Sequence, residues 1–436
     1  MKKIIIITLL FATIKLFGQD TVKEYWSNNQ LMSVGVKVGG IEHGQWTYYH
    51  KNGKKWSEGV FQYGRKTGHW MMWYEDGQVS QDYYADNGTF KSYYKTGAVE
   101  AVGQFKDGKR SGLWTFQHPN GKLFKKCEFI NDSINGDVTE YHDNGQKAFE
   151  GSYINGKLNG YAHWWRKDGT LEMEGSSIND LQDSTWIFYN KDGSVGSKGN
   201  FKGGLQQGIW SYYYENGKLW KKGGYTDGKR TGVWTAWYET GAKQREGAFT
   251  NDKETGKWTQ WYPNGLMQNE GYFKEGRMSG NWSGLYPDGT KKYEIQYNEG
   301  QKHGSYKYWN PNGTKQAEGF YQNGLQHGKW NDYAQNGQLL QNGKYVKGKK
   351  NGMWAFYNER GSKIREQNFK DDVADGAFKE YYANGKKQMV GSYSNRSKNG
   401  TWSYWDKSGK LIYSVEFQNG KIVKTYKDTD KNNKPF

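Results

Sequence analysis

The sequence predicts an all-β fold: an elongated array of about sixteen 24-residue β-hairpin repeats that form one long twisted antiparallel sheet or solenoid. Three observations lead to this prediction: a glycine returns every 24 residues, a second glycine follows nine residues later, and aromatic residues stand in fixed columns. Self-similarity at a period of about 20 to 50 residues is typical of repeat architectures. The stretch 208–231, GIWSYYYENGKLWKKGGYTDGKRT, shows the repeat most clearly.

The opening glycine of each repeat defines position 0, and later positions are counted from it. Every interval between openings is 24 residues except that from 68 to 88, which is 20, and Ser184 replaces glycine in one repeat. A register this strict favours one continuous array over separate domains. The openings stand at residues 44, 68, 88, 112, 136, 160, 184, 208, 232, 256, 280, 304, 328, 352, 376 and 400.

Each repeat contains two turn signals, which predict two strands per repeat and thirty-two in all. Glycine occupies position +9 in every repeat, represented by Gly53, Gly217, Gly265 and Gly313, and Asn or Asp precedes it in most repeats. Asn-Gly and Asp-Gly between aromatic segments are strong hairpin signals because such turns require positive φ. A second signal, such as Asp227-Gly228, ends the repeat.

Aromatic columns define the two strands of the repeat. Position +2 is aromatic in fourteen of the sixteen repeats, and a second aromatic column stands at +5. Because side chains alternate along a strand, we expect these two columns on opposite faces. A third column at +17 follows a glycine at +15, which we expect to let a neighbouring ring lie on bare backbone. The +2 tryptophans are Trp46, Trp70, Trp114, Trp186, Trp210, Trp234, Trp258, Trp282, Trp330, Trp354 and Trp402.

The ends of the chain depart from the repeat. Residues 1–18 are predicted to be a signal peptide, because Lys2 and Lys3 precede an apolar run and Gly18 offers a small residue at its end. An uncleaved anchor is the alternative, although the run is short for a membrane span. Residues 19–43 are predicted to be a degenerate N-terminal capping repeat, residues 44–426 the repeat array, and residues 427–436 a disordered polar tail. We therefore expect an exported protein of the periplasm, the outer membrane surface or the extracellular space.

The composition indicates a basic chain in which aromatic side chains supply most of the buried surface. Aromatic residues make up 17% of the sequence and glycine contributes 60 residues. Removal of residues 1–18 takes away Lys2, Lys3 and Lys15 and leaves +14 of the formal +17 charge. Cys127 is the only cysteine, which excludes an intramolecular disulfide. It stands in the +15 column, where we expect a structural role.

The unit G-x-W-x-x-Y-Y-x-N-G-K followed by G-x-[YF]-x-[ND]-G-K resembles the MORN (membrane occupation and recognition nexus) repeat, in its bacterial variant with a unit in the low twenties. The resemblance extends from Gly44 to about Tyr426. It implies a β-hairpin repeat fold and a scaffold or binding module. Some such proteins contact membrane lipids and some bacterial relatives carry an antitoxin label, whereas the predicted export signal departs from the antitoxin description.

Nothing in the sequence points to catalysis, and we expect no enzyme activity, no cofactor and no metal. His118 and His142 are neighbours by register and could share a metal, but no third ligand completes a set. A glutamate at +14 recurs in half of the repeats beside Lys and Arg. A repeated carboxylate of this kind is a solvated charge ladder, unlike the single placed pair that acid–base chemistry needs.

Binding is the expected function, and the candidate residues are the tyrosine column at +6, Tyr214, Tyr238, Tyr262 and Tyr286, with the basic turn Lys229-Arg230. The alternative interpretation is that these tyrosines only cover the tryptophan column. We predict an exported non-catalytic scaffold that binds a protein or a cell-envelope component. The alternatives are a glycan-binding module that uses the aromatic ladders, or binding of anionic lipid headgroups through the basic turns. Nucleic acid is not the expected partner of an exported chain, and the sequence leaves both the partner and the open or rolled form of the sheet undetermined.

Overall fold

The computed structural model describes residues 19–427, and these residues form strands and turns without any helix. All 37 strands are antiparallel and belong to one sheet, and β1 (Gln19–Tyr25) and β37 (Lys421–Lys427) each pair with a single strand within the described residues. The predicted all-β hairpin array is therefore confirmed, with an open sheet. Residues 19–427 contain no helix that could cross a membrane. The predicted signal peptide and residues 428–436 of the predicted tail lie outside the described residues, whereas Lys427, predicted to begin the tail, ends β37.

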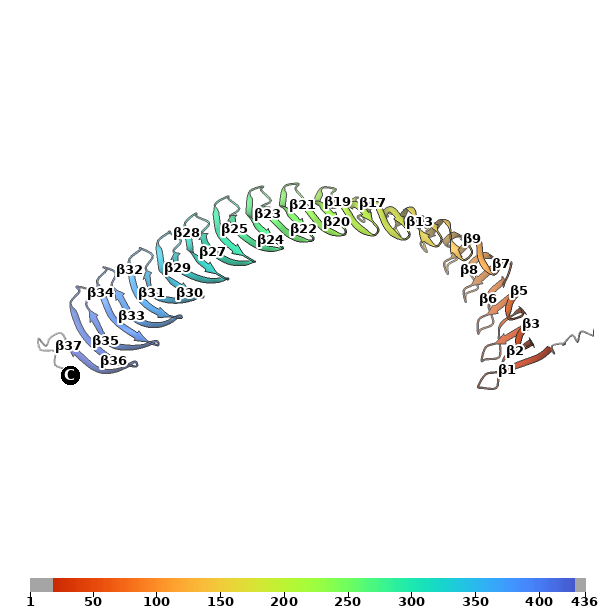
Figure 1. Cartoon of the computed structure of the whole chain (residues 1–436), viewed down its shortest axis with the longest axis horizontal. Helices are drawn as coiled ribbons and strands as arrows, with labels where there is room; N and C mark the ends of the chain where they lie inside the picture. The colour runs from red at the N-terminus through yellow and green to blue at the C-terminus, as the bar shows by residue number, and fades with distance from the viewer. Residues whose placement is uncertain (1–18, 428–436) are drawn as a thin grey trace, which may run out of the picture. The chain divides into compact units, whose positions relative to one another are not determined.

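The chain divides into two compact halves at Leu205 and Gln206. In each half, successive hairpins lie side by side (Figure 1). The strands of the N-terminal half after β1 are β2 (Leu31–Val38), β3 (Ile41–Tyr49), β4 (Lys55–Gln62), β5 (Arg65–Trp73), β6 (Val79–Tyr84), β7 (Gly88–Tyr93), β8 (Val99–Lys106), β9 (Lys109–Gln117), β10 (Leu123–Ile130), β11 (Ser133–Ile134), β12 (Gly136–Tyr141), β13 (Lys147–Ile154), β14 (Lys157–Leu158), β15 (Gly160–Trp165), β16 (Leu171–Ile178), β17 (Leu181–Tyr189) and β18 (Val195–Lys202).

The C-terminal half continues the same alternation. Its strands before β37 are β19 (Leu205–Tyr213), β20 (Leu219–Thr226), β21 (Lys229–Trp237), β22 (Lys243–Thr250), β23 (Lys253–Trp261), β24 (Met267–Lys274), β25 (Arg277–Leu285), β26 (Lys291–Asn298), β27 (Gln301–Trp309), β28 (Lys315–Gln322), β29 (Leu325–Tyr333), β30 (Leu339–Val346), β31 (Lys349–Tyr357), β32 (Lys363–Lys370), β33 (Val373–Tyr381), β34 (Lys387–Ser394), β35 (Ser397–Trp405) and β36 (Leu411–Gln418).

The structure has more strands than the thirty-two expected, and three features account for the difference. Residues 19–43 supply β1 and β2, and the chain adds β37 after the last repeat. The strands that open two repeats are each broken in two, which separates β11 from β12 and β14 from β15. The segment 19–43 follows the repeat pattern closely, because Trp26 at its +6 position donates its indole N–H to Tyr49 O at 3.1 Å.

The turns of successive repeats are tied to one another. In the first turn, Gly217 has φ +77°, and the Tyr214 N–H donates to Lys218 O at 2.9 Å. In the second turn, Asp227 and Gly228 both have positive φ, as a type I′ turn requires, and Gly228 N–H donates to Gln206 O, at the start of β19, at 3.0 Å. Asparagine at +8 donates its side-chain amide to a carbonyl 23 residues later at Asn52, Asn120, Asn144, Asn264, Asn312, Asn336 and Asn384.

The opening glycine forms a β-bulge. Between β22 and β23, Gly247 faces Trp258 and Ala248 faces Thr255, so the register shifts around Gly256. Gly256 has φ +65°, which only glycine adopts readily, and Ser184 takes φ 59° at the same position. This bulge explains why glycine recurs at position 0, which in the sequence served only to mark the start of each repeat.

One face of the sheet carries the tryptophans, and we call it the indole face. Trp258 is 4% exposed, and its indole N–H donates to Ala248 O at 3.2 Å. A Cβ atom added to Gly247 would lie 2.0 Å from the indole, so the ring rests directly on the glycine backbone. Phe249 and Phe273 meet Trp258 edge-on, with ring centroids 5.0 and 6.1 Å away. Edge-to-face contacts of this kind stabilise the ring chain.

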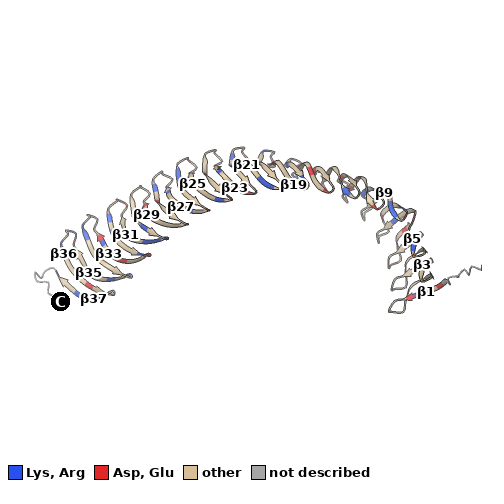
Figure 2. Cartoon of the chain, viewed as in Figure 1, with Lys and Arg blue, Asp and Glu red and all other residues tan. Residues whose placement is uncertain are grey.

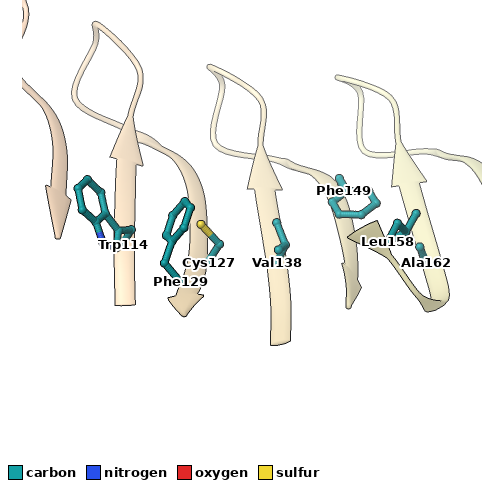
Figure 3. Close-up of a cluster of buried hydrophobic side chains, with 7 residues drawn as sticks. All are labelled: Trp114, Cys127, Phe129, Val138, Phe149, Leu158 and Ala162. Atoms are coloured by element: carbon teal, nitrogen blue, oxygen red, sulfur yellow. The ribbon is translucent and has the colours of Figure 1, made fainter. Parts of the chain in front are cut away.

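A tryptophan at +2 occurs only where glycine stands eleven residues earlier. Each of the eleven +2 tryptophans has glycine eleven residues earlier, and wherever another residue takes the glycine position the next repeat has no tryptophan at +2. Cys127 is followed by Val138, Ile295 by Tyr306 and Gln367 by Phe378. Cys127 and Val138 lie in one cluster of buried side chains (Figure 3), and their exposed fractions are 1% and 0%. Cys127 therefore has the structural role expected from its column.

In several repeats, a basic side chain at position +22 covers rings of the indole face. Lys66 Nζ lies 4.2 Å from the Trp70 ring centroid, and Lys350 Nζ lies 4.3 Å from that of Trp354. Burial lowers the pKa of both lysines. Their stems shield the indole while the charge faces its π cloud. Figure 2 marks Lys and Arg on hairpin after hairpin, and part of this charge therefore serves packing.

Substitution of Gly247 tests the contact on which the indole face depends. We expect Gly247→Ala to lower the free energy of unfolding by about 1–3 kcal/mol, because its Cβ would overlap the Trp258 indole. The double variant Gly247→Cys with Trp258→Val copies the Cys127 and Val138 pair and should be more stable than the sum of its single variants. Urea unfolding of all four proteins measures this coupling. Additive effects would contradict the proposed contact.

Candidate binding surface

The second face of the sheet, which we call the open face, carries positions +1, +3, +5, +14 and +16. The expectation that the +2 and +5 rings point to opposite faces is confirmed, because Trp165 at +5 stacks on His163 at +3, with centroids 5.4 Å apart. Trp186 at +2 instead stacks with Phe188 at +4 on the indole face. Alternation along each strand thus separates the packing rings from those of the open face.

Lysine at +11 and glutamate at +14 form an ion-pair ladder on the open face. In one repeat, Lys243 Nζ lies 2.8 Å from Glu246 and 5.7 Å from the ring centroid of Trp261 in the next repeat. The lysine therefore lies over the +5 ring. The pairs are Lys55–Glu58, Lys147–Glu150, Lys243–Glu246, Lys291–Glu294, Lys315–Glu318 and Lys363–Glu366.

Glu318 is the most strongly held carboxylate of this ladder. It accepts from Lys315 Nζ at 2.7 Å, the Tyr333 hydroxyl at 2.6 Å and the Asn331 amide at 3.1 Å. The lysine and tyrosine hydrogen bonds lower the pKa of Glu318 to about 2. Burial and the same carboxylate raise the pKa of Tyr333 to about 12. The glutamate is an acceptor that joins two repeats, as expected for a charge ladder.

The predicted tyrosine ladder lies along the first turns and joins each repeat to the next. The hydroxyls of Tyr214, Tyr238, Tyr262 and Tyr286 donate to the +5 carbonyl of the following repeat at 2.8, 2.8, 3.0 and 2.7 Å. All four side chains are partly buried, and burial raises the pKa of Tyr214 and Tyr286. The Tyr214 ring faces Trp220, which is not part of the tryptophan column, with centroids 6.1 Å apart.

The two residues of the predicted basic turn have different surroundings: one packs against the next repeat and the other is exposed to solvent. Arg230 Nε donates to Asp252 Oδ1 at 3.0 Å, and its guanidinium carbon lies 4.0 Å from the Phe249 ring centroid. Lys229 is exposed. Arg230 is therefore committed to the packing of the next repeat, and only Lys229 is freely presented.

His118 and His142 share the +6 position with the tyrosines. Their Nε2 atoms contact Tyr141 O and Trp165 O, both at 2.8 Å. Residues 19–427 contain no group of three His, Cys, Asp or Glu side chains that could hold a metal ion.

Sequence reasoning missed a series of exposed apolar side chains at positions +1 and +16 of the open face, which we call the apolar stripe. These two positions face each other across the hairpin, as Lys257 faces Tyr272. The exposed fractions run from 37% to 62%, and each side chain comes from a different repeat. The residue type changes from repeat to repeat, so no column was apparent. The stripe comprises Val60, Tyr84, Leu113 and Tyr161 in the N-terminal half and Ile209, Val233, Tyr272, Phe320 and Met353 in the C-terminal half.

A hollow with both polar and apolar lining lies next to the stripe in the C-terminal half. It has a volume of about 360 Å³ and is lined by Tyr272 together with Lys257, Glu270, Asn281 and Glu294. The Lys257 ammonium lies 2.7 Å from Glu270, and this pairing raises the lysine pKa. Ionic and amide groups thus interrupt the apolar surface.

Removal of one tyrosine hydroxyl tests the ladder. We expect Tyr238→Phe to lower the free energy of unfolding by about 0.5–1.5 kcal/mol, because the bond to Trp261 O is lost while the ring remains. Thermal or urea unfolding measures the change, with the exposed Tyr25→Phe as control. Equal stability of Tyr238→Phe and the wild type would show that the hydroxyl does not clamp the repeats.

Acid titration tests Glu318. Its folded-state pKa lies below that of an unfolded glutamate, so its stabilising effect is present above about pH 4.5 and is lost as the pH falls towards 2. We expect Glu318→Gln to reduce the loss of stability across this interval. Urea midpoints from pH 5 to pH 2 measure it, with the exposed Glu359→Gln as control. Parallel curves for Glu318→Gln and the wild type would refute the assignment.

Comparison with solved structures finds alignments over most of the chain at low identity. Solved structures titled TcdB2-TccC3-TEV and TcdB2-TccC3-Cdc42 align over 94% and 93% of the chain at 8% and 9% identity, with TM-scores of 0.16 and 0.12. The chain spans only 26% and 28% of their lengths. No curated protein matches it.

The MORN repeat variant matches nine segments that share the register of the hairpins described above. Each match begins two residues before an opening position. The matched residues are 42–63, 86–107, 110–131, 134–155, 206–227, 254–275, 302–323, 374–395 and 398–419. The chain therefore belongs to the MORN repeat variant family.

Proposed function

We propose that this chain is an exported, non-catalytic scaffold that binds a protein of the cell envelope along its open face. Export rests on the signal-peptide pattern of residues 1–18, and the scaffold role rests on the repeat architecture. The observation that carries the binding proposal is the apolar stripe, because its side chains stabilise no contact of the indole face.

Exposed apolar side chains in a series are unfavourable in water unless a partner covers them. Burial of one such side chain contributes about 1.5–3 kcal/mol, so a few of them are enough to anchor a protein. Val233 is 62% exposed and Ile209 56%, in adjacent repeats of one half. The Lys–Glu ladder beside them supplies the polar rim that protein interfaces have.

The repeat spacing favours an extended partner over a compact one. Equivalent positions of adjacent repeats are two strands apart, about 10 Å by the usual strand spacing. A peptide in extended conformation covers that distance in about three residues. A chain laid across the strands can therefore meet successive stripe residues within one half.

The same contacts make the two alternatives weaker. A glycan would need open ring faces, but a lysine lies over the +5 rings of several repeats, as Lys243 lies over Trp261. An anionic surface would need free basic turns, but in the predicted turn only Lys229 is free, because Arg230 is paired with Asp252. Among the ion pairs and ring contacts of the described residues, the stripe takes part in only two, the ring contacts of Tyr84 with His69 and of Tyr161 with His163.

Site-specific photo-crosslinking tests the proposal in the source cells. A benzophenone amino acid at Val233 or at Tyr272 should yield the same protein adduct in the envelope fraction. The matched control is Leu325, which is 50% exposed but lies beside the second turn, away from the stripe. Adducts at Leu325 equal to those at Val233, or no adduct at either stripe residue, would refute a protein partner on this face.

Once the adduct is identified, affinity tests the chemistry. Val233→Glu should weaken binding of the purified partner by at least tenfold, since a carboxylate would enter an apolar contact. Leu325→Glu should leave it unchanged. A larger loss of affinity in Leu325→Glu than in Val233→Glu would instead place the interface on the turns.

A further inference from the structure

Ala236 leaves a gap in the ring packing of the indole face. It occupies position +4, which is aromatic in eight of the sixteen repeats, as at Tyr212 of the preceding repeat and Phe356 of a later one. On β20, Lys221 faces Ala236, and on β22, Arg245 faces it from the other side. Two cationic side chains thus flank one methyl group on three neighbouring strands.

A third cation completes the cluster. Arg230 lines the same hollow, which has a volume of about 130 Å³ and a floor formed by Trp234, Phe249 and Trp258. Each cation lies against a ring: Lys221 Nζ is 4.4 Å from the centroid of Tyr212, and the guanidinium carbon of Arg245 is 4.1 Å from that of Trp258. The aromatic contacts hold the cations in place around the hollow.

Positive charge exceeds negative charge at this hollow. Arg230 pairs with Asp252 at 3.0 Å and Arg245 with Glu254 at 3.6 Å, while Lys221 has no ion pair with a carboxylate within the described residues. The Arg245 Nε is buried and has no hydrogen-bond partner among those residues. Burial, together with the charge of Arg230, lowers the pKa of Lys221 and of Arg245.

Arg365 shows what the same position looks like without a hollow. It occupies the +13 position that Arg245 has, but Phe356 stands at the neighbouring +4 position and lies 4.1 Å from its guanidinium carbon. On the next strand, Glu380 faces Arg365 and offers a carboxylate. Arg365 is therefore a matched internal control.

We propose that Lys221, Arg230 and Arg245 form a binding site for one tetrahedral oxyanion, a phosphate or sulfate group. Guanidinium groups bind such oxygens through paired N–H donors, and the unpartnered Nε of Arg245 offers one. The lysine adds a point charge, and Ala236 leaves the space that the anion fills. The site lies on the face opposite the apolar stripe and is independent of it.

The experiment follows the arginine Nε–H resonances of ¹⁵N-arginine-labelled protein, a spectrum of nine signals because the sequence has nine arginines. Addition of inorganic phosphate or sulfate should shift the Arg245 signal, and the shift should saturate at an anion concentration below about 10 mM. The Arg365 signal should keep its position. Ala236→Tyr keeps every charge but fills the hollow as Tyr212 does, and should weaken binding at least tenfold. Lys221→Gln should weaken it as well.

The outcomes separate the source of the anion. If phosphatidylglycerol vesicles bind the wild type and not Ala236→Tyr, the site takes a phosphate presented by a lipid. If inorganic phosphate saturates the site and vesicles bind both proteins equally or neither, the ligand is a soluble phosphate or sulfate. The absence of a saturable Arg245 shift, or an unchanged affinity in Ala236→Tyr, would overturn the proposal.

Discussion

The structure depends on one contact, an indole laid flat on the bare backbone of the preceding repeat. A single-layer sheet has no second layer to bury its apolar side chains, so each ring must be covered by its neighbours. Trp258 meets this need with Gly247 beneath it and with Phe249 and Phe273 at its edges. Because the contact joins two repeats, it fixes their spacing as well as their stability. Repeat proteins gain stability from nearest-neighbour interfaces of this kind.

The basic charge of the chain follows partly from the same requirement. The outer face of an indole would meet water, and in three repeats a lysine from the preceding repeat covers it, as Lys66 covers Trp70. On the open face, lysines pair with glutamates and lie over the +5 rings. A net charge of +17 therefore does not by itself indicate an anionic partner. The role of each basic side chain has to be judged from the contacts that it makes at its own position.

Much of the fold could be predicted from the sequence because the frame is periodic. Turn glycines, ring columns and opposite faces all follow from fixed spacing, and the pairing of Trp258 with Gly247 is visible in the sequence once two repeats are aligned. The bulge at Gly256 was not foreseen, since strand alternation alone does not require an extra residue. The site was harder to predict. Tyrosine recurs at position +6, which suggested a binding ladder, yet this recurrence reflects a hydrogen bond between repeats, as from Tyr238 to Trp261 O. The apolar stripe recurs in place but not in residue type.

A departure from the frame indicates function only when the structure does not compensate for it. Cys127 replaces a glycine, but Val138 replaces the tryptophan above it, and both are buried in one cluster. That pair is a structural substitution. Ala236 has no ring at position +4, which is aromatic in eight of the sixteen repeats, and the flanking Lys221 and Arg245 add charge around the hollow that remains. An uncompensated gap with unbalanced charge is unfavourable for the folded chain alone. A bound anion would remove both defects, because it fills the volume and supplies the opposite charge.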